Sequence, residues 1–481
     1  MKKLQRRTLF VLLFILALAA GTVVLCAFYV KDGAQWASFY GNQHVYTNGR
    51  IASGSIQDRN GTTLFDCAEG QYSDDKTTRI STLHAIGDKQ GNINTGAKNL
   101  FADQLVGFSL ITGTSGTGNT IKLTLDANLN NAAYQAMAGR KGVAALYNYE
   151  TGEVLCMLST PSFDPADDAE AAKVAAGDSN YDGAYLNRFL SGTYTPGSTF
   201  KLCTSVAALE EGIITPTTII QDKGIYTYYK DPQPMCWIWR QARTTHGRIN
   251  VSQAIVDSCN YFYYEVGRLT GIKKLDEYAT AFGLGQHTGI EIGDESGVLA
   301  SPEWAETHDR EWTDGQTITA AIGQSYNLFT PLQLANYVAT LVSGGEHYEA
   351  HLLKNVKSYD NSRIIDVYDK GTLNEMHISE STMAAVTKGM HDLTHDSLQG
   401  AFSRCVVEAG AKTGSAQVGT DIANGTFVAY APYDDPEIAI AIVVEKGGSG
   451  SLLANAAVDI INAWFTRGGS SASLGENTLL Q

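Results

Sequence analysis

The most constraining feature of this sequence is an uncharged apolar run close to its N-terminus, from Leu9 to Val30. The run has 22 residues. As a helix it would be about 33 Å long, which is enough to cross the hydrocarbon core of a bilayer. Four basic residues precede it: Lys2, Lys3, Arg6 and Arg7. Because basic residues favour the cytoplasmic side of a span, the sequence predicts one membrane helix with a cytoplasmic N-terminus and the rest of the chain outside.

A cleaved signal peptide is the alternative interpretation of this run. Ala17-Leu18-Ala19 has the small-x-small form of a cleavage site. The apolar run continues well past it, however, whereas the apolar region of a signal peptide has only about 7–15 residues. Bulky Leu25 before Cys26 argues against lipid attachment at that cysteine. We therefore expect an uncleaved anchor.

The rest of the chain has the composition of a large folded protein. The whole sequence has 481 residues, which is too long for one ordinary domain. Of these residues, 44% are hydrophobic. That share excludes a mostly disordered protein. Beyond residues 1–30 the chain carries 31 basic and 50 acidic residues. This acidic balance, with no basic stripe after the first seven residues, argues against a nucleic-acid partner.

The cysteines give no sign of a metal site. One of the seven lies in the apolar run, and the other six form no CxxC pair and no regular spacing, so we expect no bound metal. Disulfides are possible outside the membrane. Free buried thiols are the interpretation we favour. The seven are Cys26, Cys67, Cys156, Cys203, Cys236, Cys259 and Cys405.

The character of the sequence changes near Asp126. Before it, residues 31–125 are polar and rich in glycine, which is typical of short strands separated by turns. After it, the pattern predicts a hairpin, a helical middle, three closing strands and a final helix, so that an antiparallel sheet joins both ends of one α+β domain. The predicted elements are a helix over 128–137, strands over 142–147 and 153–159, helical stretches within 198–345, strands over 405–417, 426–431 and 438–444, and a helix over 452–465.

These features divide the chain into five segments. The C-terminal segment, 467–481, is polar and rich in glycine and serine, which is typical of disorder. We expect a cytoplasmic tail (1–7), a transmembrane anchor (8–30), a β-rich pedestal or docking domain (31–135), a larger α+β domain (136–466) and a disordered tail (467–481).

A candidate nucleophile lies where a helix is predicted to begin. Pro196 and Gly197 form a turn, and an apolar helical run follows them, so Ser198 is expected at the helix N-terminus. Lys201 lies one turn later on the same face. A partly buried, neutral amine can accept the hydroxyl proton, and helix N–H groups can stabilise an oxyanion. Ser-x-x-Lys alone is a weak signal, because Ser73 to Lys76 also matches it in a charged, turn-rich stretch.

Two further motifs follow in order. Ser258-Cys259-Asn260 lies in the helical middle, although Ser325-Tyr326-Asn327 matches the same Ser-x-Asn pattern. Lys412-Thr413-Gly414-Ser415 lies in a predicted apolar strand, where a lysine is costly unless it faces a polar cleft. Gly414 would let a substrate backbone lie close to the strand. The three motifs in this order form the signature of penicillin-recognising serine acyl enzymes.

The chain as a whole resembles the membrane-anchored class B penicillin-binding proteins, which are peptidoglycan D,D-transpeptidases. The resemblance covers roughly residues 45–465. Ser53 and Ser55 depart from the family's N-terminal motif, and Ser325 stands where the family usually has glycine. The other matching segments are Gly54–Gly61, Arg79 with His84 and Gly87, Asn187-Arg188, His246-Gly247, 321–324 and 330–333.

The resemblance implies a fold and a set of roles. Residues 136–466 would be the transpeptidase domain, an antiparallel sheet flanked by helices with a helical subdomain. Ser198 would attack the penultimate D-Ala of a stem pentapeptide, with Lys201 as general base. Ser258 and Lys412 would pass a proton to the leaving amine, and Asn260 would hold the substrate amide. Thr413, Gly414 and Ser415 would bind substrate, and the N–H groups of Ser198 and Ser415 would form the oxyanion hole.

The resemblance also implies partners and a location. Peptidoglycan stem peptides would be the substrates, and β-lactam antibiotics would acylate Ser198. A separate polytopic glycan polymerase would be the membrane partner, and no cofactor or metal is implied. The protein would lie in the bacterial plasma membrane as a single-pass protein with an extracytoplasmic catalytic domain. A role in elongation, division or sporulation is left open, as are the stem-peptide chemistry and the redox state of the cysteines.

Other functions of the same fold are weighed against this one. A β-lactamase needs a group that activates the deacylating water, and no such glutamate can be assigned. The N-terminal motif argues against a D,D-carboxypeptidase. A non-enzymatic β-lactam sensor or scaffold is the remaining alternative, but all three motifs are intact. A glycosyltransferase domain does not fit into the roughly 95 residues between the anchor and residue 126.

Overall fold

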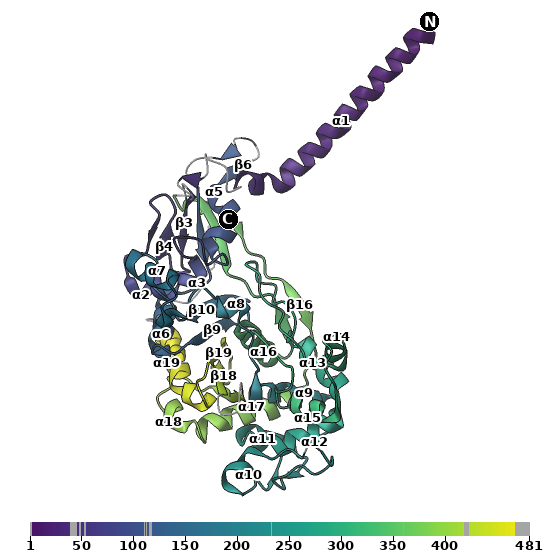
Figure 1. Cartoon of the computed structure of the whole chain (residues 1–481), viewed down its shortest axis with the longest axis vertical. Helices are drawn as coiled ribbons and strands as arrows, with labels where there is room; N and C mark the ends of the chain where they lie inside the picture. The colour runs from purple at the N-terminus through teal and green to yellow at the C-terminus, as the bar shows by residue number, and fades with distance from the viewer. Residues whose placement is uncertain are drawn as a thin grey trace, which may run out of the picture. The chain divides into compact units, whose positions relative to one another are not determined.

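The computed structural model describes most of the chain, in two compact units (Figure 1). Unit 1 comprises Met1–Ser73, Ala97–Leu123 and Leu353–Tyr368, and unit 2 comprises Asp74–Gly96, Thr124–Leu352 and Asp369–Gln481. Ser53 and the predicted tail over 467–481 lie outside the described residues. Those are 2–38, 46–47, 50–51, 54–109, 111, 113–114, 118–231, 233–358, 360–417 and 423–466. The predicted domain boundaries stay predictions.

The chain begins with a long helix, α1 (Lys2–Ala37), whose side chains from Leu4 to Lys31 are exposed (Figure 1). In the described part of the chain, it is the one helix long and apolar enough to cross a membrane. A signal sequence near the N-terminus would meet the same criterion. The helix fits the predicted anchor.

Unit 1 contains a six-stranded sheet in the order β15-β14-β8-β3-β4-β5. β3 and β8 pair in parallel, with Ile56 opposite Ile121, and the other neighbours are antiparallel. Two strands from late in the sequence therefore complete a sheet begun near the N-terminus. The bounds are β3 (Ser55–Gln57), β4 (Thr63–Asp66), β5 (Gln71–Tyr72), β8 (Asn119–Leu123), β14 (Leu353–Ser358) and β15 (Ile364–Val367), with α4 (Ala97–Leu100), α5 (Ala102–Val106) and the short pairs β1 (Tyr46–Thr47) with β2 (Arg50–Ile51) and β6 (Phe108–Ser109) with β7 (Gly113–Thr114).

Unit 2 is built on a five-stranded antiparallel sheet in the order β10-β9-β19-β18-β17. The first hairpin of the unit pairs with the last strands, with Leu146 opposite Ile440. The predicted α+β fold, with a sheet that joins both ends of the domain, is confirmed. The strands are β9 (Gly142–Asn148), β10 (Val154–Thr160), β17 (Gly410–Gln417), β18 (Ala423–Ala431) and β19 (Ile438–Val444).

Helices cover both faces of this sheet (Figure 1). Alternate residues of β19, Ile438, Ile440 and Ile442, pack in one buried cluster with α6 (Ala127–Met137) and α19 (Ala454–Phe465). Since successive side chains of a strand point to opposite faces, the intervening residues face the other side. There α16 (Pro331–Val342) packs against β9, β18 and β19. The sheet is buried on both faces, which explains why its strands are continuous apolar runs.

Three predicted boundaries near the C-terminus are wrong. The strand predicted over 426–431 begins three residues earlier, as β18 at Ala423, where it pairs with Gln417 of β17. β17 begins at Gly410, not at Cys405, because the Cys405 N–H donates to Phe402 O in a turn and the Val406 N–H donates to Asn462 Oδ1. The final helix begins at Ala454, after the 3-10 turn η3 (Gly450–Leu453).

The helical middle predicted within 198–345 is confirmed. α9 packs against α12 and α13, and α17 packs against α11 and β17. These helices and their neighbours in unit 2 are α2 (Lys76–Ser81), α3 (Leu83–Ile86), α7 (Asp168–Ala175), η1 (Ser179–Tyr181), α8 (Arg188–Ser191), η2 (Gly197–Phe200), α9 (Lys201–Glu210), α10 (Trp237–Ala242), α11 (Val251–Val256), α12 (Asn260–Thr270), α13 (Ile272–Ala281), α14 (Pro302–Thr307), α15 (Asp314–Ala320), α17 (Glu380–His395) and α18 (Gln399–Phe402), with the short pairs β11 (Ile220–Gln221) with β12 (Arg248–Ile249) and β13 (Glu346–Tyr348) with β16 (Thr372–Glu375).

Candidate active site

Ser198 lies half-buried in η2, the 3-10 turn that leads into α9. The turn is fixed from two sides. Gly197 has a φ of +56°, and its N–H donates to Gly323 O at 2.9 Å. A Cβ on Gly197 would lie 3.0 Å from Ser415 O. The loop that carries Ser198 is therefore held against strand β17.

Lys201 joins the first motif to the second. Its side chain is fully buried, and Nζ donates to Asn260 Oδ1 at 2.6 Å, to Ser258 O at 2.8 Å and to Ser258 Oγ at 3.2 Å. The ammonium also lies 5.4 Å from the ring centroid of Tyr263. Burial lowers the pKa of Lys201 to about 8, although the charges of Cys259 and Cys236 act in the opposite direction. An amine with this pKa can accept a proton near neutral pH.

The second motif is a strained turn at a helix start. Ser258 has a φ of +49°, which is the left-handed region that non-glycine residues seldom adopt. Cys259 caps α12, and its Sγ accepts from Phe262 N–H at 3.5 Å. Asn260 is the first residue of α12. Such strain persists where the surroundings fix the backbone, and it is common at functional sites.

Lys412 lies on β17, opposite Val428 of β18, and is fully buried. Its Nζ donates to Thr413 O at 3.2 Å. Burial lowers the pKa of Lys412 well below its ordinary value, and the positive charge of Lys201 lowers it further. The amines of the first and third motifs therefore influence each other electrostatically, and one of them is readily neutral.

The glycine of the third motif serves the protein's own packing. A Cβ on Gly414 would lie 2.6 Å from Pro196 O, so β17 touches the loop before Ser198. Thr413 is half-buried and Ser415 is exposed. Ser415 Oγ accepts from Gly450 N–H at 3.3 Å. Within the chain, Pro196 makes the close approach at Gly414, and the approach of a substrate backbone stays a prediction.

The side chains of the two decoy matches make other contacts. Asp75 of the first decoy caps α2, and its carboxylate accepts from Thr78 N–H at 2.7 Å. Ser325 donates to Gln316 Oε1 at 2.8 Å. The structure therefore brings together the predicted site residues (Ser198, Lys201, Ser258, Asn260, Lys412, Thr413, Gly414 and Ser415), whereas the Ser325 side chain, two residues after Gly323, bonds to Gln316 instead of to a motif residue.

A family comparison agrees with this constellation. Residues 142–462 match the family described as "Penicillin binding protein transpeptidase domain". The chain belongs to the penicillin-binding protein transpeptidase family. The predicted resemblance to class B penicillin-binding proteins is confirmed.

Individual relatives of this penicillin-binding protein have low sequence identity to it, but the matches cover most of its length. Peptidoglycan D,D-transpeptidase MrdA of Acinetobacter baumannii is 30% identical in an alignment of length 368, and the match covers 72% of this chain and 54% of MrdA. The chain thus spans about half the length of the MrdA relatives that it matches. The crystal structure of Pseudomonas aeruginosa PBP2 in complex with WCK 5153 is 27% identical, with a TM-score of 0.74 over 88% of this chain and 99% of that one. A chain of a peptidoglycan synthase complex is 28% identical, with a TM-score of 0.62 over 73% of this chain and 64% of that one.

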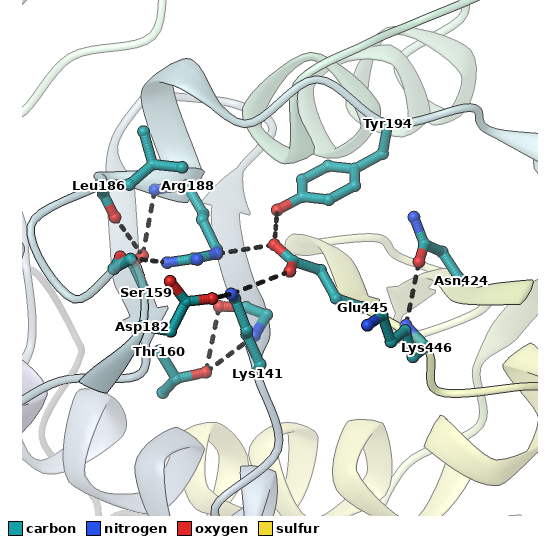
Figure 2. Close-up of polar contacts among 12 residues, drawn as sticks. Lys141, Ser159, Thr160, Asp182, Leu186, Arg188, Tyr194, Asn424, Glu445 and Lys446 are labelled. Atoms are coloured by element: carbon teal, nitrogen blue, oxygen red, sulfur yellow. Dashed lines mark hydrogen bonds and ion pairs between the residues drawn. The ribbon is translucent and has the colours of Figure 1, made fainter. Parts of the chain in front are cut away.

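Sequence reasoning missed a buried ion pair near the nucleophile loop of this penicillin-binding protein. Arg188 Nε donates to Glu445 Oε1 at 2.7 Å, and Tyr194 OH donates to the same oxygen at 3.0 Å (Figure 2). Burial alone would raise the pKa of Glu445, but the hydrogen bond and charge of Arg188 lower it below its ordinary value. Tyr194 precedes the Ser198 turn, so the pair fixes the approach to the nucleophile. No local pattern connects Arg188 with Glu445, because they are far apart in the sequence.

Sequence reasoning also missed a cluster of four residues with side chains that can bind a metal, next to the second motif. Asp222, Cys236, His246 and Cys259 place one donor atom each within 4.8 Å of the others. The thiols of Cys236 and Cys259 share a hydrogen bond, which lowers the pKa of Cys236 and raises that of Cys259. The cysteine spacing did not predict this set, because its members come from four separate segments.

Three of the donor distances in this cluster match edges of a tetrahedral zinc site. They are 3.8 Å between the two sulfurs, 3.5 Å from Cys236 Sγ to His246 Nδ1, and 3.6 Å from Cys259 Sγ to Asp222 Oδ2. Zinc bonds of about 2.3 Å to sulfur and about 2.0 Å to nitrogen or oxygen give tetrahedral edges of roughly 3.8 Å for S–S and roughly 3.5 Å for mixed pairs. A fourth of the six edges, from His246 Nδ1 to Asp222 Oδ2, is shorter at 2.9 Å, because these two atoms share a hydrogen bond that metal binding through Nδ1 would replace. The residues present therefore fit Zn²⁺.

A surface hollow of about 370 Å³ lies between α11 and α17. Its lining includes Asn250, Ser252 and Lys388. No residue of the three motifs lines it, so the chemistry described above points to the motif site and not to this hollow.

Proposed function

We propose that this protein is a peptidoglycan D,D-transpeptidase that works through a Ser198 acyl-enzyme. The observation that carries the proposal is the position of Lys201. Its buried amine has a lowered pKa, follows Ser198 by one helical turn, and bonds to both polar residues of the second motif. This arrangement supports the assignment of Ser198 as nucleophile and Lys201 as its base.

The proposed acylation breaks one peptide bond and forms one ester. Ser198 Oγ attacks the carbonyl carbon of the penultimate D-Ala while Lys201 accepts the hydroxyl proton. The bond to the terminal D-Ala breaks, and its amine takes a proton that passes through Ser258 and Lys412. The 3.2 Å contact between Lys201 Nζ and Ser258 Oγ supports the Ser258 part of this relay.

The remaining residues would position the substrate. Asn260 would bind a backbone amide with the part of its side chain that Lys201 does not use. Thr413 and Ser415, which are half-buried and exposed on β17, would bind the terminal carboxylate. The N–H groups of Ser198 and Ser415 would stabilise the oxyanion. An amine of a second stem peptide would then resolve the ester and form the cross-link.

The anchor and the relatives support a location and a partner. The apolar part of α1 would hold the protein in the bacterial plasma membrane, with the N-terminus in the cytoplasm and the catalytic domain outside. The similar chain reported above belongs to a synthase complex that coordinates polymerization and crosslinking. We extend this to a polytopic glycan polymerase as the membrane partner of this chain.

A glycan polymer with pentapeptide stems tests the proposal. The purified full-length chain should release D-Ala from it and produce cross-linked stem dimers, which chromatography and mass spectrometry detect. Ser198→Ala should abolish both products, and Ser73→Ala in the decoy motif should leave both unchanged. Release of D-Ala without cross-links, when an acceptor stem is present, would indicate a carboxypeptidase. Neither product from a folded wild-type protein would contradict the proposal.

A further inference from the structure

Two histidines and a glutamate meet at the surface of unit 2, where α17 ends. His391 and His395 are four residues apart in α17, so their side chains lie on the same face of the helix. Glu408 comes from the segment between α18 and β17. One donor atom of each residue lies within 4.8 Å of those of the other two. The C-terminal end of a long helix carries a partial negative charge, which favours a cation at this position.

The distances within this group suit a metal ion with nitrogen and oxygen ligands. Glu408 Oε2 lies 3.1 Å from His391 Nε2 and 3.1 Å from His395 Nε2. For metal bonds of about 2.0–2.1 Å, adjacent ligands are roughly 2.9 Å apart around an octahedral ion and roughly 3.3 Å apart around a tetrahedral one. The two measured edges lie between these values. An ion could therefore bind all three atoms with little movement of the side chains.

Hydrogen bonds at the far side of its ring orient His395 for such a bond. Its Nδ1 lies 3.1 Å from Thr394 Oγ1 and 3.2 Å from His391 O. The Thr394 hydroxyl donates to His391 O at 2.7 Å, so the Thr394 oxygen can accept from Nδ1–H of His395. In the neutral ring, a proton on Nδ1 leaves the lone pair on Nε2, which faces Glu408. A hydrogen bond of this kind fixes the tautomer of metal-binding histidines.

Tyr433 holds the other two side chains in place. The His391 ring stacks on the Tyr433 ring, with the centroids 4.1 Å apart and the planes at 27°. The Tyr433 N–H donates to Glu408 O at 2.8 Å. The three candidate ligands are still accessible, because the side chains of His391, His395 and Glu408 are 24%, 51% and 62% exposed. An ion can thus enter from solvent, and water can fill its remaining positions.

We propose that His391, His395 and Glu408 form a surface site for a divalent first-row transition ion of the class of Zn²⁺ or Ni²⁺. Imidazole nitrogen is a ligand that these ions prefer, and the carboxylate adds a compensating charge. The bound ion ties the last turn of α17 to the segment before β17, because Glu408 precedes Gly410, the first residue of β17, by two positions. It therefore stabilises the start of the strand that carries Lys412.

Isothermal titration calorimetry with Ni²⁺ tests the site in the full-length chain in detergent, purified without a histidine tag. The chain is first incubated with Zn²⁺ and freed of excess, so that the cluster around Cys236 is occupied. Wild type should then bind about one Ni²⁺ per chain, and His395→Ala should weaken this binding at least about tenfold. The matched control is His287→Ala. It removes an exposed histidine that pairs with Asp294 alone at 3.2 Å, and it should bind Ni²⁺ as wild type does.

Hydrogen exchange followed by mass spectrometry locates the bound ion. Ni²⁺ should slow exchange in peptides that cover 388–396 and 405–412 of wild type, because the ion links these two segments. Glu408→Gln, a second variant at an exposed position, should lose both this protection and the Ni²⁺ binding. Circular dichroism checks that each variant is folded.

Equal Ni²⁺ affinity of wild type and the two folded site variants would overturn the proposal, as would protection only outside these two segments. Absence of Ni²⁺ binding by wild type would overturn it as well. Penicillin plays no part in these measurements, and none of the three ligands belongs to the motifs of the proposed reaction. Failure of the metal site is therefore distinguishable from failure of the transpeptidase assignment.

Discussion

At the scale of single residues, the site is governed by two buried amines that affect each other. Lys201 and Lys412 are both fully buried, and each would be costly to keep charged there. Lys201 has three oxygen acceptors within 3.2 Å, whereas Lys412 bonds to Thr413 O and feels the charge of Lys201. This difference between the surroundings of Lys201 and Lys412 suits two amines that transfer protons during the reaction.

The lowered pKa of Lys201 predicts the pH dependence of acylation. The base is active when deprotonated, so the rate of acylation by penicillin should rise as pH increases through about 8. A stopped-flow or quenched labelling series measures this rate, and circular dichroism over the same range checks that the fold is unchanged. A rate that is flat across this range, or that falls as pH rises, would remove Lys201 from the role of base.

At the scale of elements, the nucleophile turn depends on close backbone contacts that only glycine permits. Gly323 has a φ of +73°, and a Cβ on it would lie 2.0 Å from Gly197 O. Gly293 has almost the same φ, +76°, but open space around it. Substitutions at the two positions can therefore be compared: both introduce backbone strain, but only the one at Gly323 also affects the turn that carries Ser198.

Gly323→Ala and Gly293→Ala should differ in activity. Gly293→Ala should lose about 1–2 kcal/mol in the free energy of unfolding, because alanine is strained at a positive φ, and Gly323→Ala should lose more, because its Cβ also meets the backbone of Gly197. Only Gly323→Ala should also slow acylation, by roughly tenfold or more, because its Cβ pushes the Ser198 turn out of place. Denaturant melts and labelling rates measure both effects. Equal labelling rates in the two variants would show that the turn tolerates the displacement.

The Arg188–Glu445 pair predicts a stability effect at the same scale. Glu445→Gln removes the charge that compensates buried Arg188, and breaking a buried pair costs about 3–5 kcal/mol. Lys141 Nζ lies 3.5 Å from the other oxygen of Glu445 at the surface, so Lys141→Met should cost less than about 1 kcal/mol. Urea unfolding of both variants measures the difference, and similar losses would contradict the assigned importance of Arg188.

The Arg188–Glu445 pair also predicts how the stability of the protein changes with pH. Because the folded-state pKa of Glu445 is lowered from 4.5, its contribution is present above that value and is lost as pH falls through the lower, folded-state pKa. In Glu445→Gln this part of the acid sensitivity should disappear.

At the scale of the whole molecule, the sequence predicted the strands and site residues that depend on local residue patterns. Continuous apolar runs and the turn at 148–152 predicted β9, β10, β18 and β19, and a lysine within an apolar strand marked Lys412 as facing a polar site. The strands β14 and β15 could not be assigned to the unit 1 sheet, because their pairing with β8 depends on contacts between distant segments. The cluster around Cys236 was missed for the same reason.

The exposed apolar part of α1 predicts how the protein partitions. Deleting residues 2–30 should move it from the membrane fraction to the soluble fraction, because no side chain from Leu4 to Val30 is buried within the protein. Penicillin labelling should persist at a similar rate. Ultracentrifugation and labelling of both forms measure this, and a truncated chain that stays with the membrane would place the attachment elsewhere.

The most direct measurement is to locate the covalent adduct. The full-length chain is incubated with fluorescent penicillin, digested, and the modified residue is identified by mass spectrometry while the label is followed for hours. The account predicts a stable adduct on Ser198 that disappears in Ser198→Ala and remains in Ser73→Ala. Label on another residue, or none on a folded wild-type chain, would contradict it, and label lost within seconds would identify a β-lactamase instead.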